Sequence, residues 1–170
     1  MPAEFRPRGL LEHLTRHGVD FVVVGGIAAA LHGSERNTFG LDICPAQGSA
    51  NSNALGTALI EIDAHLRDID EDIPFVPDGR SLAGIEILTL STSLGPLDIL
   101  VRPHGSPPYA ALRRHATQMD VGAAAPVLVA SIDDLIAMKR ESDRPKDRDD
   151  IERLEALARL SRRLARAGRE

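Results

Sequence analysis

The sequence predicts an α+β protein with one central mixed β-sheet. Short apolar runs of strand length occur together with segments whose apolar residues recur every three or four positions, and the two kinds do not alternate strictly. A chain of 170 residues without an internal repeat or a linker is expected to form a single domain, residues 1–170. Because aromatic residues make up only 3% of the chain, leucine, valine, isoleucine and alanine must fill the core.

The first 45 residues predict two helices and two strands. The first helix carries its leucines on one face, and a glycine ends it. The first strand is continuously apolar, as expected for a strand buried on both faces, until a Gly-Gly pair interrupts it. A short alanine-rich helix and a second strand, closed by Pro45, follow. These four elements are expected at residues 8–17, 21–24, 27–32 and 41–44.

The middle of the chain predicts a long helix and a β-hairpin. Small polar residues precede the helix and are expected to form a loop. An acidic segment with two prolines follows the helix and is expected to be a loop with one edge strand. Gly95-Pro96 then separates two segments of strand character, as in a hairpin. The expected ranges are loop 48–53, helix 55–66, loop 68–79 with an edge strand at 75–76, and strands 85–90 and 97–101.

The last third of the chain predicts three helices and one short strand. Two prolines open the first helix, since proline is tolerated in a first turn. Ser131 and Asp134 form a Ser-x-x-acid capping box that places the start of the second helix at Ile132. Pro145 separates it from a last helix with leucines at three- and four-residue steps. The expected ranges are helix 107–115, strand 127–130, a helix from 132, and helix 147–167.

Charge and cysteine content limit the class of protein. The net charge of −5 does not indicate general nucleic-acid binding, although arginines cluster around 102–114 and in the tail. A single cysteine, Cys44, excludes an internal disulfide and indicates a reducing compartment. No apolar run approaches 18 residues, and the N-terminus lacks the apolar stretch of a signal peptide. We therefore expect a cytoplasmic protein that does not associate with membranes.

The segment 22–43 carries the strongest functional signal. Its Gly25-Gly26 pair lies between a strand and a helix, where glycines let the backbone approach a phosphate. Asp42 lies on the next strand, where an acid can hold the metal ion that accompanies the phosphate. Arg36 is a phosphate ligand by type, and the hydroxyl of Thr38 can contact a phosphate or a metal.

This segment resembles the signature of the polymerase-β-like nucleotidyltransferases, and more closely that of the AbiEii/MenT branch of toxins. That branch reads Arg-x-Ser/Thr-x-Asp-x-Asp, whereas this chain reads Arg36-x-Thr38-x-Gly40-x-Asp42. The resemblance implies the nucleotidyltransferase fold, a small mixed sheet flanked by helices with a C-terminal helical part. A glycine occupies the expected first metal-ligand position. The chain is therefore expected to be impaired in transfer.

Other candidate site residues lie further along the chain. Asp98 is an acid inside an apolar strand, which is costly unless the acid is paired or binds metal, and it matches the third carboxylate of the wider superfamily. The resemblance implies a triphosphate contact for Lys139 and a distal acid at either Asp147 or Asp150, which share a helical face. The six histidines are not expected to form a metal site.

The function implied by the resemblance is that of a toxin from a toxin–antitoxin pair. It would use Mg²⁺ to transfer nucleotides, most plausibly from CTP or UTP, to the 3′ end of tRNA, and its partner would be a cognate antitoxin. RNA is expected to approach over Arg36, Arg102, Arg113 and Arg114. Two alternatives stay open: a minimal nucleotidyltransferase antitoxin that adenylylates a partner toxin, and a catalytically inactive binding protein.

Overall fold

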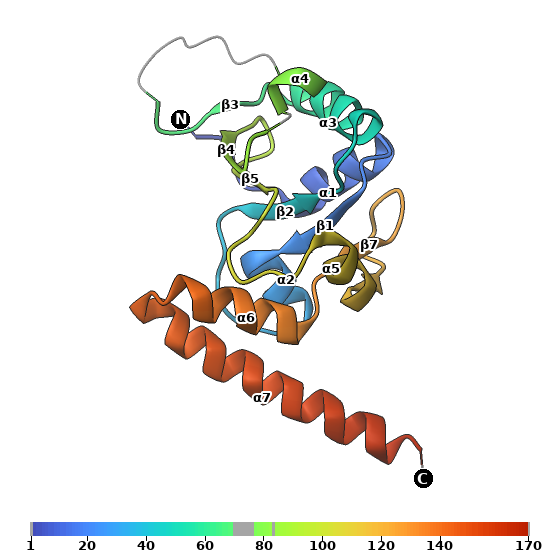
Figure 1. The fold of residues 1–170 in the computed structure, drawn as a ribbon, viewed down its shortest axis with the longest axis vertical. Coiled ribbons are helices and arrows are strands. Elements are labelled where there is room, and N and C mark those ends of the chain that lie inside the picture. The colour runs from blue at the N-terminus through green and yellow to red at the C-terminus, as the bar shows by residue number, and fades with distance from the viewer. Residues whose placement is uncertain (1, 70–76, 83, 170) are drawn as a thin grey trace.

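The computed structural model describes residues 2–69, 77–82 and 84–169 (Figure 1). Within these ranges seven strands form one mixed sheet in the order β3-β4-β5-β2-β1-β7-β6. The α+β prediction with a central mixed sheet flanked by helices is therefore confirmed. The strands are β1 Phe21–Val24, β2 Leu41–Pro45, β3 His65–Leu66, β4 Ile87–Ser91, β5 Leu97–Leu100, β6 Thr117–Met119 and β7 Val127–Val129.

Two parallel pairs lie at the centre of the sheet, and antiparallel pairs complete it. β1 pairs parallel with β7, and β2 pairs parallel with β5, while β1 and β2 run antiparallel to each other. All four residues of β1 are buried, as the continuously apolar run predicts. β4 and β5 pair antiparallel across the predicted hairpin turn.

Two pairs of helices lie at opposite ends of the molecule (Figure 1). α6 and α7 form a helical hairpin at the end of the molecule where α2 lies, and α3 and α4 lie at the opposite end. The Ser131 hydroxyl accepts a hydrogen bond from the Asp134 amide, so the predicted cap of α6 is confirmed. The helices are α1 Pro7–Arg16, α2 Gly25–Leu31, α3 Ser49–Glu61, α4 Gly79–Leu82, α5 Tyr109–His115, α6 Ile132–Ser142 and α7 Pro145–Ala167.

The predicted loop at 48–53 is wrong, because α3 begins at Ser49. Asn51 explains the difference: its side chain donates to the carbonyls of Asp20 and Ala46 and accepts from the Asp20 amide. Asn51 thus bonds the first turn of α3 to the residue before β1 and to the residue after β2. The same helix ends at Glu61 instead of 66, since Asp63 adopts a left-handed φ of 52°.

Several other boundaries differ from the predictions. α2 begins at Gly25, so the Gly-Gly pair lies inside the first turn of the helix and not in a loop before it. β3, α4 and β6 were not expected, and α7 begins at Pro145. The predicted edge strand at 75–76 lies outside the described residues.

The far part of α7 leaves the core. Leu154 and Ala158 are buried, whereas Leu160 and Leu164 are 53% and 64% exposed. The leucine pattern predicted one apolar face along the whole helix, but only the first half of that face has a covering element within the described chain. In Figure 1 the last turns of α7 extend beyond the rest of the molecule. No described helix combines the length and the apolar character that crossing a membrane requires.

Candidate functional site

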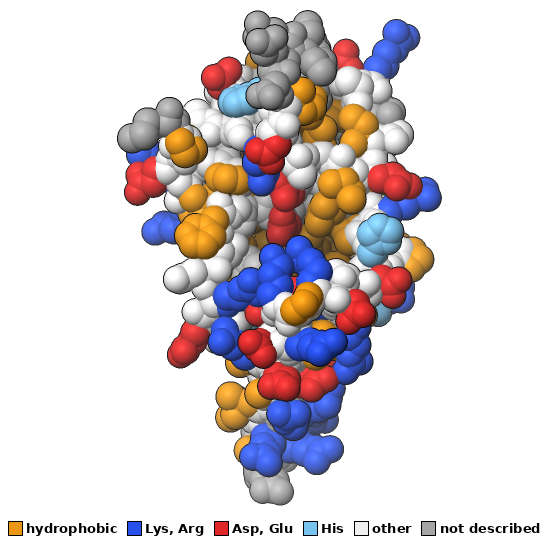
Figure 2. All heavy atoms as spheres, turned by 90° about the vertical axis from the view of Figure 1, so that its left-hand side faces the viewer, with side chains coloured by type: hydrophobic (Ala, Val, Ile, Leu, Met, Phe, Trp, Pro, Cys, Tyr) orange, Lys and Arg blue, Asp and Glu red, His pale blue; other side chains and the backbone are white. Residues whose placement is uncertain are grey.

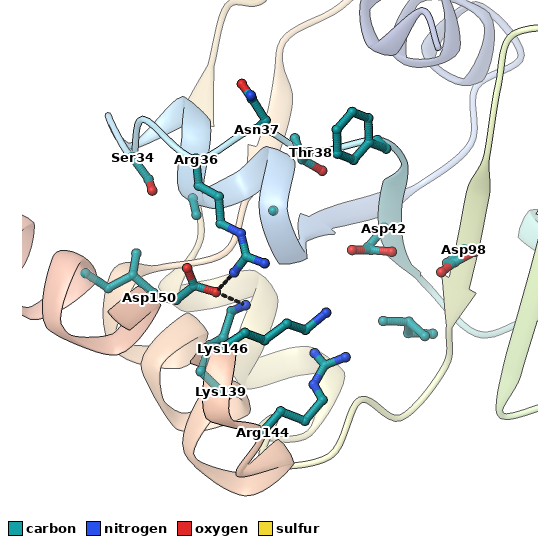
Figure 3. A pocket seen from close by; sticks show the side chains of 15 residues that line it. Ser34, Arg36, Asn37, Thr38, Asp42, Asp98, Lys139, Arg144, Lys146 and Asp150 are labelled. Atoms are coloured by element: carbon teal, nitrogen blue, oxygen red, sulfur yellow. Dashed lines mark hydrogen bonds and ion pairs between the residues drawn. The ribbon is translucent and has the colours of Figure 1, made fainter. Parts of the chain in front are cut away.

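A pocket of about 420 Å³ lies between the sheet and the α6–α7 hairpin (Figure 3). It brings together the Gly-Gly helix, the loop after it, two central strands and both helices of the hairpin. Its lining residues are Gly26, Ala29, Ser34, Arg36, Asn37, Thr38, Phe39, Asp42, Asp98, Leu100, Lys139, Arg144, Lys146, Asp150 and Leu154.

Asp42 and Asp98 form a pair of carboxylates on neighbouring strands. The parallel register of β2 and β5 places Asp42 opposite Asp98. The residues on either side of each acid point to the other face and are buried there, which fixes which side chains reach the pocket. Burial, and then the charge of Asp98, raise the pKa of Asp42 from its ordinary value of 3.8 to about 7.

Arg67 compensates part of this negative charge. Its guanidinium donates to the carboxylate of Asp98 and, at 3.1 Å, to the carbonyl of Leu90, while its buried Nε has no hydrogen-bond partner among the described residues. Sequence reasoning missed this residue, because Arg67 lies between the expected helix 55–66 and the expected loop 68–79 and belongs to no recognisable motif.

The Gly-Gly pair makes room for two site residues. A Cβ on Gly25 would lie 2.0 Å from Oδ2 of Asp42, and a Cβ on Gly26 would lie 2.8 Å from Oγ1 of Thr38. Gly25 also has a positive φ of 66°. Side chains at either position would displace Asp42 or Thr38, so the glycines are required by close approach of the site side chains. The expectation from the sequence was that these glycines allow close approach of a phosphate.

Gly25→Ala is expected to destabilise the protein more than Gly18→Ala. Both glycines have nearly the same φ, 66° and 69°, but nothing lies within 4 Å of a Cβ at Gly18. The backbone cost, about 1–2 kcal/mol, is therefore shared, and the clash with Asp42 adds to it only at Gly25. Urea unfolding of the two variants gives the difference directly. Equal losses of unfolding free energy would show that Asp42 moves aside without cost.

Opposite the acids, Lys139 anchors a network of charges. Its ammonium lies 2.8 Å from Oδ2 of Asp150 and 3.2 Å from Oδ1 of Asp147, and Arg36 also donates to Asp150. Arg36 and Asp150 are separated by 114 residues, so this contact joins the loop after α2 to α7. Lys139, Arg36 and Asp150 all line the pocket, as expected for residues of one site.

Asp147 differs from Asp150 in its surroundings. Asp147 is fully buried, does not line the pocket, and accepts from the Ser142 hydroxyl and from the Arg144 backbone amide and guanidinium. Burial alone would raise the pKa of Asp147, but hydrogen bonds from Ser142, Arg144 and Lys139 outweigh it and hold the pKa well below its ordinary value. Asp147 caps α7, and Asp150 is the one of the two that reaches the pocket.

Two further cations, Arg144 and Lys146, line the pocket from the start of α7. Both side chains extend toward the space in front of Asp42 and Asp98 (Figure 3). Figure 2 shows the same division on the surface, with acidic side chains at the centre of the face and a group of lysines and arginines directly below them. Neither residue was among the expected site residues.

Gly40 lies where the missing acid is expected. It directly precedes β2, and its Cβ would lie 3.3 Å from Cβ of Pro96, the residue before β5. The Leu41 amide donates a hydrogen bond to the Pro96 carbonyl. The pairing of β2 with β5 therefore extends one residue further, to Gly40 and Pro96. A side chain at position 40 would therefore emerge next to Pro96 as Asp42 emerges next to Asp98, after a shift of a few tenths of an ångström.

Asp42 is expected to make the stability of the protein fall as the pH rises from about 4 to 7. Over this range the folded chain keeps a proton on Asp42 that the unfolded chain has already lost, so the free energy of unfolding decreases. The full effect is at most about 4 kcal/mol, and solvent at the open pocket reduces it. Urea unfolding at pH 5 and pH 8 should show a smaller decrease for Asp42→Asn. Parallel pH profiles of the two proteins would contradict this.

The remaining bases expected along an RNA path lie elsewhere. Arg113 lies 3.8 Å from Asp20, Arg102 lines a different cavity with Tyr109, and Arg114 does not line the pocket. Of the four arginines, only Arg36 lines the pocket. Cys44 is buried, with a thiol pKa raised by burial to about 11, in agreement with a packing role.

No protein-family model matches the chain, and no curated protein sequence matches it. Among solved structures, it is similar to a Thermotoga maritima protein described as a "putative nucleotidyltransferase". The TM-score is 0.44 and the identity 16%, over 96% of this chain and 97% of that chain.

Proposed function

We propose that this chain has the nucleotidyltransferase fold and binds a nucleoside triphosphate in the pocket, as a nucleotidyltransferase does. One observation carries the proposal: a register-paired carboxylate couple, Asp42 and Asp98, faces a group of cations across a pocket of about 420 Å³. A metal-bound triphosphate needs both kinds of charge, acids for the metal and cations for the phosphate oxygens. The cations are Arg36, Lys139, Arg144 and Lys146.

The acid pair fits Mg²⁺ by its chemistry. Carboxylate oxygens are the ligands that hard divalent cations prefer. Burial first, and then the charge of Asp98, raise the pKa of Asp42, and Arg67 offsets only part of this. Asp42 and Asp98 would hold the ion. When bound there, Mg²⁺ would neutralise charge on the phosphates during nucleotidyl transfer.

The protein's own side chains would position the rest of the nucleotide. Arg144 and Lys146 are exposed, and Arg144 bonds to Asp147 through Nε, which leaves its terminal nitrogens to face phosphate oxygens. Lys139 and Arg36 are held in place by Asp150. Thr38 presents its hydroxyl beside Gly26. Phe39 lines the pocket and is 78% exposed, so its ring offers an apolar face to a nucleobase.

The motif in residues 36–42 supports a more specific proposal. By its resemblance to AbiEii/MenT toxins, the chain would transfer pyrimidine nucleotides from CTP or UTP to the 3′ end of tRNA in the cytoplasm, and a cognate antitoxin would counteract it. Gly40 favours a second candidate, a protein that binds the nucleotide and transfers it poorly. Gly40 contributes no ligand, which leaves Asp42 and Asp98 as the carboxylates of the pair.

Two measurements test the proposal. Equilibrium dialysis with labelled CTP, UTP, ATP or GTP, with and without Mg²⁺, tests binding, and incubation with labelled nucleotide and total tRNA tests transfer. Asp98→Asn should reduce Mg²⁺-dependent binding, while Asp149→Asn, on the exposed side of α7, should not. Binding that is absent, or insensitive to Asp98→Asn, would refute a nucleotide site. Label on a partner protein instead of tRNA would identify the minimal antitoxin type.

A further inference from the structure

A second group of metal-ligating side chains lies where α1 contacts α3. His13 lies on α1, and His17 follows one turn later as the residue at the C-cap of this helix; their ring centroids are 4.4 Å apart. Glu61 is the last residue of α3, and its carboxylate lies 3.0 Å from Nε2 of His17. Neither helix contributes a residue to the lining of the nucleotide pocket.

From this arrangement, we infer that His13, His17 and Glu61 form a site for a divalent transition metal ion, Zn²⁺, that joins α1 to α3. One candidate ligand atom from each residue lies within 4.8 Å of the other two. Two histidines and one glutamate are a donor set that Zn²⁺ accepts, with a fourth position left to water. The expectation that the histidines form no metal site overlooked the four-residue spacing of His13 and His17.

Backbone carbonyls orient both imidazole rings. His17 Nδ1 lies 2.9 Å from the carbonyl of His13, and since a carbonyl only accepts, Nδ1 carries the hydrogen. Nε2 of His17 faces the Glu61 carboxylate at 3.0 Å and donates to it, so Zn²⁺ would bind at Nε2 in place of that proton. His13 Nε2 donates to the carbonyl of Ala58 on α3 at 2.8 Å, which holds its buried ring at the interface. Orientation of this kind by carbonyl groups is typical of metal-binding histidines.

The three side chains need to move only a short distance to coordinate the ion. Donors of a tetrahedral zinc site with bonds of about 2.0–2.1 Å lie about 3.3 Å apart, so the 4.8 Å limit leaves about 1.5 Å to close. The Glu61 side chain is 56% exposed and free to move, whereas the His17 side chain is 17% exposed and already in place. The exposed side of Glu61 also admits the water ligand.

Isothermal titration with ZnCl₂ tests the inference on the full chain. All proteins carry Asp42→Asn and Asp98→Asn, so that the pocket carboxylates do not contribute. The otherwise unchanged protein should bind one Zn²⁺ in the micromolar range. Glu61→Gln and His17→Gln should each weaken binding by at least about tenfold, and the control His65→Gln, an exposed histidine on β3, should not.

Thermal unfolding supplies a second readout. Zn²⁺ that joins two helices should raise the melting temperature of the protein with an intact site, and the rise should disappear in Glu61→Gln. Glu61→Gln changes a largely exposed side chain and keeps the fold, so its result is interpretable even if His17→Gln folds poorly. Unchanged zinc affinity in Glu61→Gln and His17→Gln, or absence of micromolar binding in the intact protein, would show that His17 and Glu61 form only an ion pair.

Discussion

Gly40→Asp is expected to raise the rate of nucleotide transfer by about two orders of magnitude or more. The new carboxylate would lie beside Pro96, two residues before Asp42. Positions 40 and 42 would then form the Asp-x-Asp motif. A ligand that stabilises the metal-bound transition state by several kcal/mol changes the rate by at least about a hundredfold. Incorporation of labelled CTP or UTP into tRNA, and growth arrest on expression, are the measurements.

Two variants at the same position separate charge from shape. Gly40→Ala introduces the same Cβ, 3.3 Å from Cβ of Pro96, without a ligand, and Gly40→Asn adds the volume of aspartate without its charge. Only the aspartate form should transfer efficiently. If the glycine form transfers as fast as the aspartate form, two acids suffice and the Asp-x-Asp reasoning is wrong for this chain. If neither form transfers while both bind nucleotide, the binding protein is the better description.

Lys139→Met is expected to abolish nucleotide binding and to lower the free energy of unfolding by about 2–3 kcal/mol. The substitution keeps most of the length of the side chain but leaves Asp147 and Asp150, which are nearly buried, with fewer positive partners. Loss of one partner from a buried ion pair costs about 3–5 kcal/mol, and the remaining contacts to Ser142, Arg144 and Arg36 reduce this figure. Urea unfolding and equilibrium dialysis measure the two effects.

Arg140→Met is the matched control, one residue further along the same helix. Arg140 points away from the pocket to Glu155, and its side chain is 63% exposed. An exposed pair of this kind contributes at most about 1 kcal/mol, so stability and nucleotide binding should change little. A Lys139→Met protein that is as stable as Arg140→Met would show that the carboxylate network does not depend on the ammonium group.

The apolar runs predicted the central strands of the sheet well, because a strand buried on both faces needs apolar residues at every position. The run Val22-Val23-Val24 is buried on both faces in β1, and the capping residue Ser131 marks the start of α6. The prediction was wrong where small polar residues form a helix whose side chains bond to distant backbone, as Asn51 does. Such long-range contacts leave no periodicity in the local sequence.

In the candidate site, too, local sequence patterns predicted some residues, and long-range contacts determine the others. Motif spacing brought Asp42, Lys139 and Asp150 to attention, and all three line one pocket. The spacing could not show which of Asp147 and Asp150 reaches the pocket, because both lie on the same face of the helix. They differ in that Asp147 is fully buried, whereas Asp150 lines the pocket. Arg67 was missed entirely, since its role follows from the position of β4 and β5 next to the segment that carries it. Charge partners of this kind are visible only in three dimensions.

The alternation of β2 and β5 also has an evolutionary consequence. The residues that hold these strands in register, Leu41, Ile43, Leu97 and Ile99, are nearly or fully buried, and the acids Asp42 and Asp98 lie on the other side. A Cβ at position 40 would lie against Pro96 and not against these core residues, so an acid there can be lost or regained without loss of the core. One base change converts an aspartate codon into a glycine codon. A lineage carrying this fold can therefore silence and recover its chemistry in single steps while natural selection continues to preserve the scaffold.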